Sequence, residues 1–323
     1  MIEVLDDPED RPVRPRSVVT LPDRLFRGLA IVAAFMSLVI VGLTAIFLVS
    51  QARPALKAAG IWRFYTTSGW NPGTGHFGVL GLLIGGIIIA AIGSVVAVPV
   101  SLAMALFINE YAPPRLRRPM TSVIDLLAAL PSLLFGMWGF FAFQHQLIPV
   151  ARWLGGHGSA LPIFRLPAKG GGSLAQSGFV AGMVVGMMMV PLITSISRDV
   201  MAQAPRDQCE GALALGGTRW GMIRTVILPF GRSGIVGATL LALGRGLGET
   251  IAVALIITFS FRANWHVLTS GAGSIPALIA TKFAEATRLE QSALVAAGLG
   301  LFVLTMVINL AARRIVARSA SLT

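Results

Sequence analysis

The chain has 323 residues, of which 55% are hydrophobic and 12% are charged, and its mean hydropathy is +0.77. Soluble domains carry about 25% charged residues. This chain therefore has too few polar side chains to cover a water-facing surface, and lipid must cover most of it. One cysteine, Cys209, excludes an intrachain disulfide. The formal net charge of +12 would suggest nucleic acid in a soluble protein, but here it must first be tested against membrane topology.

Six stretches are apolar and long enough to cross a hydrocarbon core of about 30 Å as helices. They cover residues 28–50, 77–109, 121–143, 174–197, 233–260 and 292–312. The runs do not alternate in polarity as β-barrel strands do, and the first is too long for a signal peptide. We therefore expect an all-α polytopic membrane protein with six transmembrane helices at 28–312, between an N-terminal tail at 1–27 and a C-terminal tail at 313–323.

The distribution of Lys and Arg predicts the orientation of these helices. Sixteen of the 26 basic residues fall on the side that holds both termini, nine fall on the other side, and Arg245 falls inside a span. Since cytoplasmic loops carry the excess of basic residues, both termini are predicted to be cytoplasmic. Only Glu285 and Glu290 supply acid on the outer side, so that surface is predicted to be positive and to suit an anionic solute rather than nucleic acid.

The chain lacks the motifs that would supply energy or covalent chemistry. None of its lysines follows a glycine, so it has no Walker A loop, and if ATP drives transport another subunit must bind the ATP and its Mg²⁺. A G-x-G-x-x-G pattern at 73–78 falls in an outer loop with no strand before it, so chance explains it. Neither H-E-x-x-H nor G-x-S-x-G occurs. We expect no catalytic residue, metal or cofactor in this chain, and a membrane-embedded enzyme is disfavoured.

The longest cytoplasmic loop, 198–232, is predicted to form two short helices. Pro205 suits a first helical position, and Gly216 ends the first helix. Thr218 is a typical N-cap for a second helix, which is expected to stop before Pro229. Such a pair is suited to insertion into a groove of a partner protein. The alternative is an amphipathic pair that lies on its own helical bundle.

This loop resembles the EAA loop of ABC importer permeases, whose pattern is E-A-A, three residues, G, nine residues and I-x-L-P. The residues that carry the resemblance are Glu210, Gly211, Ala212, Gly216, Leu228 and Pro229, with Gly211 in place of the second residue of the pattern. The run from 212 to 250, together with DLLAALPSLLFGMWGFF at 125–141, is similar to the C-type permease subunits of phosphate-specific transporters. The resemblance covers residues 77–312.

The resemblance implies an ABC importer permease fold in the cell inner membrane. It implies that the chain forms half of a pathway for inorganic phosphate and pairs with a second, A-type permease. A dimer of ATP-binding subunits would dock on the EAA loops, and an extracytoplasmic phosphate-binding protein would deliver the substrate. Two alternatives stay open: a permease for another oxyanion such as molybdate or phosphonate, and a membrane sensor or scaffold that transports nothing.

Arg245 is the basic residue inside a predicted span, about 12 residues or roughly 18 Å from its start and therefore near mid-membrane. The resemblance places Arg245, Glu249 and Thr250 along the translocation route. We expect Arg245 to attract a passing phosphate while Glu249, one turn on, orients it; the alternative is a structural ion pair between subunits. Ser132, after a predicted kink, either donates to the phosphate or satisfies a freed helix carbonyl. Asp125 is expected to be structural.

Overall fold

The computed structural model describes residues 21–158, 160–165 and 173–320 of the chain. The elements in chain order are α1 (Leu21–Ala59), α2 (Ile61–Thr66), β1 (Ser68–Asn71), η2 (Pro72–Thr74), β2 (His76–Val79), α3 (Leu80–Leu106), η3 (Phe107–Tyr111), α4 (Pro114–Ala129), α5 (Ser132–Trp138), η4 (Gly139–Phe143), α6 (Gln144–His157), η5 (Pro162–Phe164), η6 (Leu174–Gln176), α7 (Gly178–Met201), α8 (Arg206–Ala214), α9 (Arg219–Met222), η7 (Ile223–Ile227), α10 (Leu228–Leu247), α11 (Ile251–Ile256), α12 (Ile275–Lys282) and α13 (Arg288–Ala320). The helical fold class predicted from the sequence is confirmed.

The chain divides into two compact units, Met1–Phe47 and Leu48–Thr323, and the division falls inside α1. The described part of the first unit is the apolar helix that the sequence predicts as the first span. Residues 1–20 of the predicted N-terminal tail lie outside the described residues, and the helix begins at Leu21. At the other end, α13 continues to Ala320, so most of the predicted C-terminal tail is helical.

Among the described residues, five helical stretches are long and apolar enough to cross a membrane, and a bent helix pair would make a sixth span. Four of the five agree with the first, second, fourth and sixth predicted spans; they are Leu21–Ala59, Leu80–Tyr111, Gly178–Met201 and Arg288–Ala312. The third predicted span is divided at the kink that the sequence predicts before Ser132, and the fifth predicted span is wrong as a continuous helix. Both contain a break whose position depends on backbone chemistry rather than on hydropathy.

The third predicted span, 121–143, is divided by a bend of 94° between Pro114–Ala129 and Ser132–His157. Leu130 and Pro131 between them have extended backbone conformations, because the residue before a proline is disfavoured in the helical region. Only Ile124 of α4 is buried. The first half of this predicted span is therefore an amphipathic helix and not a buried membrane helix.

The fifth predicted span, 233–260, also differs from the structure. A continuous helical stretch runs from Arg219 to Leu247 and then breaks before the short helix α11. Its length of 29 residues corresponds to about 44 Å, so the helix begins well before the predicted start at residue 233. The break at Gly248–Thr250 separates Arg245 from Glu249 and changes the geometry expected of that pair.

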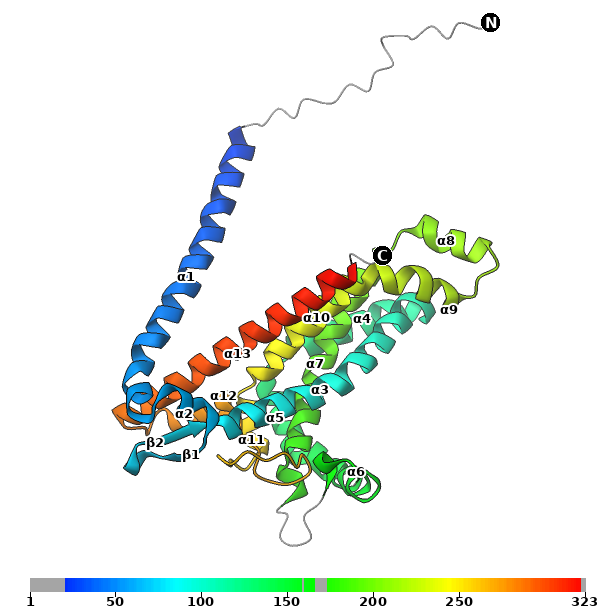
Figure 1. The fold of residues 1–323 in the computed structure, drawn as a ribbon. Coiled ribbons are helices and arrows are strands. Elements are labelled where there is room, and N and C mark those ends of the chain that lie inside the picture. The colour runs from blue at the N-terminus through cyan, green and yellow to red at the C-terminus, as the bar shows by residue number, and fades with distance from the viewer. Residues whose placement is uncertain (1–20, 159, 166–172, 321–323) are drawn as a thin grey trace, which may run out of the picture. The chain divides into compact units, whose positions relative to one another are not determined.

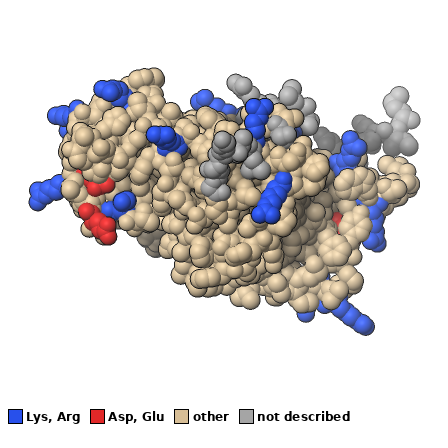
Figure 2. All heavy atoms as spheres, turned by 90° about the horizontal axis from the view of Figure 1, so that it is seen from below, with Lys and Arg blue, Asp and Glu red and all other residues tan. Residues whose placement is uncertain are grey.

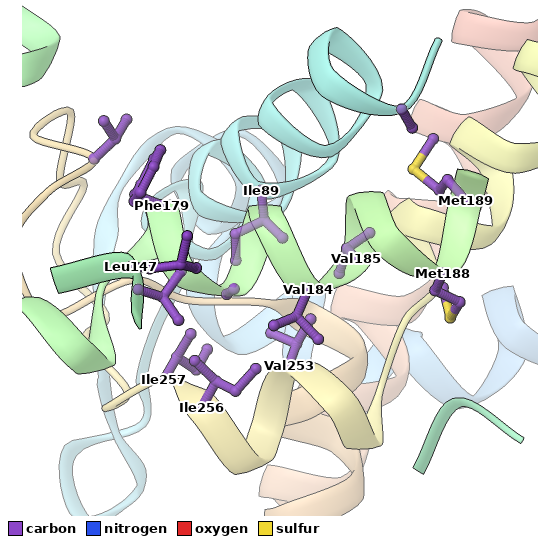
Figure 3. Close-up of a cluster of buried hydrophobic side chains, with 14 of the residues drawn as sticks. Ile89, Leu147, Phe179, Val184, Val185, Met188, Met189, Val253, Ile256 and Ile257 are labelled. Carbon is purple, nitrogen blue, oxygen red and sulfur yellow. The ribbon is translucent and has the colours of Figure 1, made fainter. Parts of the chain in front are cut away.

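The core of the second unit lies where α7 packs against α3, α10 and α11. Val184, Val185 and Met189 of α7 meet Ile89 of α3 and Val253 of α11, as Figure 3 shows. Because apolar side chains face inward on several sides of α7, this helix is the most enclosed of the long ones. The helices α3, α10 and α11 pack around it.

Close approach of α3 and α7 depends on two small residues. A Cβ atom at Gly93 would lie 3.0 Å from the backbone nitrogen of Gly186, and a Cβ atom at Gly186 would lie 3.0 Å from the carbonyl oxygen of Gly93. Glycines at such a crossing let two helix backbones approach without side chains between them. Gly244, by contrast, has no atom of the described residues within 4 Å of its Cβ position, so it makes no such close helix contact there.

The two ends of the bundle in the second unit are different in character. Figure 1 shows α8 and α9 at one end and the β1–β2 hairpin and α6 at the other. In the hairpin, the antiparallel strands place Trp70 opposite Phe77, and Trp70 Nε1 donates to Glu290 Oε1 at 2.9 Å. The end with α8 and α9 carries the loop that resembles an EAA loop, so it is the predicted cytoplasmic end.

A serine of α13 forms hydrogen bonds with two backbone groups of α1 beside a proline. The Ser292 hydroxyl donates to the Gln51 carbonyl at 2.7 Å and accepts from the Ala55 N–H at 3.0 Å. In an uninterrupted helix these two backbone groups would bond to each other. Because Pro54 lies between them and disturbs the helix, the hydroxyl inserts into the ladder and joins the last turns of α1 to α13.

Candidate functional site: the coupling loop and the substrate pathway

The first helix of the predicted coupling loop ends in a complete Schellman motif. The Gly217 N–H donates to the Ala212 carbonyl at 3.2 Å, and the Gly216 N–H donates to the Leu213 carbonyl at 3.0 Å. Gly216 has a φ of 84°, the left-handed conformation that this motif requires and that glycine adopts without a steric penalty. The end that the sequence predicts for α8 is therefore confirmed.

The second helix of the loop begins as predicted but does not stop before Pro229. Thr218 Oγ1 accepts from the Gly221 N–H at 3.1 Å and caps the start of α9. The chain then forms the π-helical turn η7 and continues as α10, with Leu228 and Pro229 in its first turn. A π turn shifts the hydrogen-bond register, so the missing N–H of Pro229 leaves no gap in the ladder. The predicted stop was wrong for this reason.

One side of the coupling loop packs on the bundle and the other side is exposed. Ile223 and Ile227 are fully buried in a small core with Met201, and Cys209 and Ala212 of α8 pack against that core. Figure 1 shows α8 at the edge of the bundle. The opposite side of α8 and the turn after it expose Glu210, Gly211, Leu213 and Leu215, with Leu215 92% exposed. The loop therefore rests on its own bundle, as the alternative interpretation expects, and also presents an exposed surface; its insertion into a partner stays a prediction.

Cys209 lies on α8 between the side that packs on the bundle and the side that is exposed. Burial raises the pKa of this thiol above its ordinary value, and the Glu110 and Glu210 carboxylates raise the pKa further by disfavouring the thiolate. The thiol therefore stays protonated at neutral pH. Glu110 ends the second span and Glu210 belongs to α8, so the charges of both elements act on one side chain.

Trp220 does not share the buried face of Ile223 and Ile227, although their spacing predicts one face. It is 57% exposed and lines an apolar groove of about 430 Å³ with Phe107 and Tyr111.

Arg245 and Glu249, predicted to act together in the pathway, are separated by the break after α10. Arg245 lies in the last turn of α10 with its side chain exposed, and within the described part of the chain it forms no hydrogen bond or ion pair. Glu249 is 6% exposed, and its Oε1 accepts from the Ala252 N–H at 3.2 Å. The carboxylate thus caps the N-terminus of α11, where the helix dipole favours a negative charge. The i, i+4 pairing expected on one continuous helix does not form.

Thr250 and Ser132 lie on either side of a tight helix contact. Thr250 Oγ1 donates to the Gly248 carbonyl at 3.1 Å and so satisfies one carbonyl of the broken segment. Ser132 begins α5, directly after the bend at Pro131. The two helices α5 and α11 pack closely, since a Cβ atom at Gly136 would collide with Ala252. Of the predicted pathway residues, Ser132 begins α5 and both Glu249 and Thr250 precede α11, whereas Arg245 lies on α10 before the break.

A charged cluster that the sequence does not predict lies between α4 and α7. Arg198 is 8% exposed although it was counted in the cytoplasmic loop, and its Nη2 lies 3.4 Å from Asp125 Oδ1 and 2.8 Å from Asp199 Oδ1. Ser195 Oγ donates to Asp125 Oδ1 at 2.7 Å. Asp125 thus joins α4 to α7 through Arg198 and Ser195. The one signal in the sequence for a basic partner is that Asp125 is an acid inside a predicted span.

The predicted outer end carries scattered basic side chains. Figure 2 shows this face, with Lys and Arg distributed over it and Asp and Glu gathered at one edge. Most of the basic residues that the sequence assigns to this side are exposed, among them Arg63, Arg262 and Lys282. Among the described residues, no cluster of three or more His, Cys, Asp or Glu side chains is arranged to hold a metal ion.

Comparison with known proteins gives consistent matches over most of the chain. Residues 97–321 match the family described as the inner membrane component of binding-protein-dependent transport systems. The chain is 40% identical over 299 residues to the phosphate transport system permease protein PstC 2 of Mycobacterium tuberculosis, and the match covers 91% of both chains. It is 39% identical over 305 residues to the phosphate transport system permease protein PstC of Xylella fastidiosa, with 92% of this chain and 91% of that protein covered.

Solved structures agree with this fold. A bacterial ABC transporter involved in the import of the acidic polysaccharide alginate matches with a TM-score of 0.54 at 16% identity, over 92% of this chain and 96% of that chain. An inward-facing conformation of the MetNI methionine ABC transporter matches with a TM-score of 0.50 at 17% identity, over 74% of this chain and 93% of that chain. The fold is that of an ABC importer permease.

Proposed function

Because the chain belongs to the family of inner membrane components of binding-protein-dependent transport systems, we propose that it is the permease subunit of an ATP-driven importer of inorganic phosphate. It is a multi-pass membrane protein and a transport component rather than an enzyme. The observation that carries the choice of substrate is the identity of 36–40% over nine tenths of the chain with relatives named as phosphate transport permeases. Both termini are assigned to the cytoplasm on the Lys and Arg distribution.

The coupling loop supplies the surface for the ATP-binding subunits. The exposed side of α8 presents Glu210, Gly211 and the leucines that follow, while Ala212 and Cys209 hold the helix to the bundle. A partner that moves α8 must therefore also move the small core beneath it, which includes the base of α10. This connection lets ATP binding and hydrolysis elsewhere drive a rigid-body change between two conformations.

Two further partners complete the transporter. A second, A-type permease supplies the other half of the pathway, and an extracytoplasmic phosphate-binding protein docks on the outer face. The basic side chains on that face suit an acidic docking surface and raise the local concentration of an anionic solute (Figure 2). ATP and Mg²⁺ are bound by the ATP-binding dimer and not by this chain.

Arg245 is the side chain best placed to act on phosphate. An arginine inside the membrane costs about 2.5 to 3.5 kcal/mol on insertion scales and needs a partner. Arg245 has none within the described part of this chain, while Glu249 is held as the cap of α11. We infer that its partner lies outside the described part of this chain, and a passing phosphate fits the planar guanidinium. Ser132, at the start of α5, is proposed to add a hydroxyl donor, whereas the Thr250 hydroxyl donates to the Gly248 carbonyl and would have to leave it to reach a phosphate.

The alternative role of Arg245 is an ion pair with the second permease. Arg245→Gln is the test, in a complex that still binds its ATP-binding subunits, with Arg115→Gln as a matched control on an exposed arginine of α4. We expect Arg245→Gln to abolish phosphate uptake and leave the amount of assembled complex unchanged. Normal uptake by the Arg245→Gln complex would remove the role in the pathway, and loss of assembly would favour the structural ion pair.

The function itself is tested by reconstitution. The four kinds of subunit are placed in proteoliposomes with ATP on the side of the ATP-binding subunits, and uptake of radiolabelled phosphate is followed. We expect ATP-dependent uptake that excess unlabelled phosphate suppresses and that molybdate or phosphonate does not. Suppression by one of those anions at lower concentration than phosphate would assign the permease to that oxyanion. ATP hydrolysis without flux of any of the three would favour the sensor or scaffold.

A further inference from the structure

The charged cluster between α4 and α7 ties together two helices that the sequence would not connect. We define the α4–α7 cluster as Asp125, Ser195, Arg198 and Asp199. Arg198 is its centre: Nε and Nη2 both donate to Asp199 Oδ1, at 3.0 and 2.8 Å, and Nη2 lies 3.4 Å from Asp125 Oδ1. The proposed function does not use this cluster. Burial of an arginine is costly, however, unless its charge is paired and its N–H groups are hydrogen-bonded.

The helix on one side of the cluster, α4, packs on α7 but is interrupted at both ends and has few buried residues. Extended backbone precedes α4 at Pro113 and follows it at Leu130, and the chain then bends by 94°. Ile124 is the residue of α4 that is buried, and the acidic side chain next to it, Asp125, is 46% exposed. A helix that is interrupted at both ends and has little buried apolar surface can move as a rigid body at low cost.

The two acids of the cluster compete for one guanidinium. Asp199 is the nearer acceptor and lies beside Arg198 on α7, so it stays with the arginine when α4 moves. Asp125 is the more distant acceptor and is partly exposed, so it regains solvent when it leaves. The charge of Arg198 is thus compensated whether or not α4 is in contact. Arg198 Nη1 is buried without a hydrogen-bond partner among the described residues, which leaves a donor for an acceptor brought by another arrangement.

The cluster is also connected to the coupling loop. Arg198 lies in the last turn of α7, just before α8, and its carbonyl accepts from Asn109 Nδ2 at 2.8 Å. Arg117 of α4 donates to the Asn109 carbonyl, and Arg219 Nη1 of α9 lies 3.5 Å from the Glu110 carbonyl. The end of the second span therefore touches α4, α7 and the loop. A displacement of the coupling loop is therefore transmitted to both α4 and α7, the helices on the two sides of the cluster.

We propose that Asp125 and Arg198 are positioning residues of the transport cycle, whose ion pair holds α4 against α7 in the conformation seen here and separates in the other conformation. The proposal rests on the proposed function, because it requires a permease that alternates between two states. Asp199 makes the separation reversible, since it keeps the arginine paired while Asp125 is away.

Asp125→Asn and Asp199→Asn each remove one acidic partner of Arg198. We expect them to shift the populations of the contact and separated states in opposite directions. Asp125→Asn keeps an oxygen for the Ser195 hydroxyl but removes the attraction between α4 and α7, so the separated state gains population. Asp199→Asn leaves Asp125 as the only charged partner of Arg198, so the contact state gains population. Glu285→Gln is the control, because it removes the same charge from an exposed position elsewhere in the unit.

The first measurement is the distance between a spin label on α4 and one in the turn that directly follows α7. Labels are placed at Arg118 and Gln203, which are both exposed, in the full transporter with Cys209→Ser, without nucleotide and with ATP plus vanadate. We expect two distance populations in the wild type, of which Asp125→Asn depletes the one present in this structure and Asp199→Asn enriches it. A single distance in every state and variant, or a shift of both variants in the same direction, would overturn the proposal.

The second measurement is the ratio of phosphate transported to ATP hydrolysed in proteoliposomes. We expect Asp125→Asn to lower this ratio by about fivefold or more, the lower end of typical coupling between sites, while Glu285→Gln keeps it. A merely structural role would reduce uptake and hydrolysis together with the amount of complex, and would leave the ratio unchanged. If the wild type itself transports no phosphate, the proposed function fails; if it transports and Asp125→Asn keeps the wild-type ratio, only the role of this cluster fails.

Discussion

Replacement by alanine at Gly216 and at Gly211, both in the coupling loop, should have opposite effects on the stability of α8. Gly216 has a φ of 84° and nothing within 4 Å of its Cβ position, so Gly216→Ala introduces backbone strain without a collision. An L-residue in the left-handed region costs about 1 to 2 kcal/mol. This strain should raise the opening equilibrium of the last turn of α8 roughly 5- to 30-fold.

Gly211 is the matched position. It lies inside α8 and also has nothing within 4 Å of its Cβ position, so Gly211→Ala adds a methyl group to a regular helix. Alanine is favoured over glycine there by about 0.8 to 1.0 kcal/mol. The opening equilibrium of α8 should therefore fall about four- to fivefold. The two variants differ only in the backbone conformation of the substituted residue.

Hydrogen exchange followed by mass spectrometry measures both effects on the purified protein. Peptides that cover α8 should exchange faster in Gly216→Ala and more slowly in Gly211→Ala, while peptides from the β1–β2 hairpin should not change. In the assembled transporter we expect Gly216→Ala to lower the ratio of uptake to ATP hydrolysis. Equal protection of α8 in Gly216→Ala and in the wild type would refute the assignment of the Schellman motif and of the rigid link built on it.

Three further outcomes are expected. Ser292→Ala should lower the free energy of unfolding by about 1 to 3 kcal/mol in thermal or denaturant titrations, because it leaves a buried N–H of α1 without its partner. Gly93→Val should lower the same free energy by about 1 to 3 kcal/mol, because it forces α3 away from α7. Alkylation of Cys209 should reach half its maximal rate above the ordinary thiol pKa, and Glu210→Gln should move that midpoint down by removing a negative charge. An unmoved midpoint in Glu210→Gln would contradict the charge contribution.

Two controls match the stability variants. Thr305→Ala removes a hydroxyl from the same helix as Ser292, but this hydroxyl donates only within its own helix to the Phe302 carbonyl, so a smaller loss is expected. Gly86→Val adds the same side chain to α3 as Gly93→Val, at a position with open space around its Cβ atom. If either control destabilised the protein as much as its partner, the hydrogen bond or the helix crossing would not be the cause.

The features that could be predicted from the sequence depend on neighbouring residues. Hydropathy over about twenty residues identifies a span because the lipid it must match is uniform, and four predicted spans are correct in position. The helix end at Gly216 and the start at Thr218 are also correct, since a cap depends on a few consecutive residues. The resemblance to importer permeases rests on the same kind of local pattern.

The errors have one physical source. At residue 131 a proline divides a predicted span, yet at Pro229 the helix continues because the π turn before it provides another hydrogen-bond register. Hydropathy does not distinguish these cases, since both segments are apolar. The break at Gly248 likewise separates Arg245 from Glu249, although their spacing fits an ion pair on one helix turn. Whether a helix continues through such a residue depends on the contacts available to its backbone groups.

The sequence was sufficient to show that this chain lies in lipid, which four stretches form continuous apolar helices, and where α8 ends and α9 begins, because lipid and local hydrogen bonds act on short segments. It did not show that Arg198 is buried between two acids or that Asp125 joins α4 to α7. Those residues are 73 positions apart, and only the packing of α7 against α4 brings their charges together. Charged side chains far apart in the chain acquire a function when folding removes them from water at the same place.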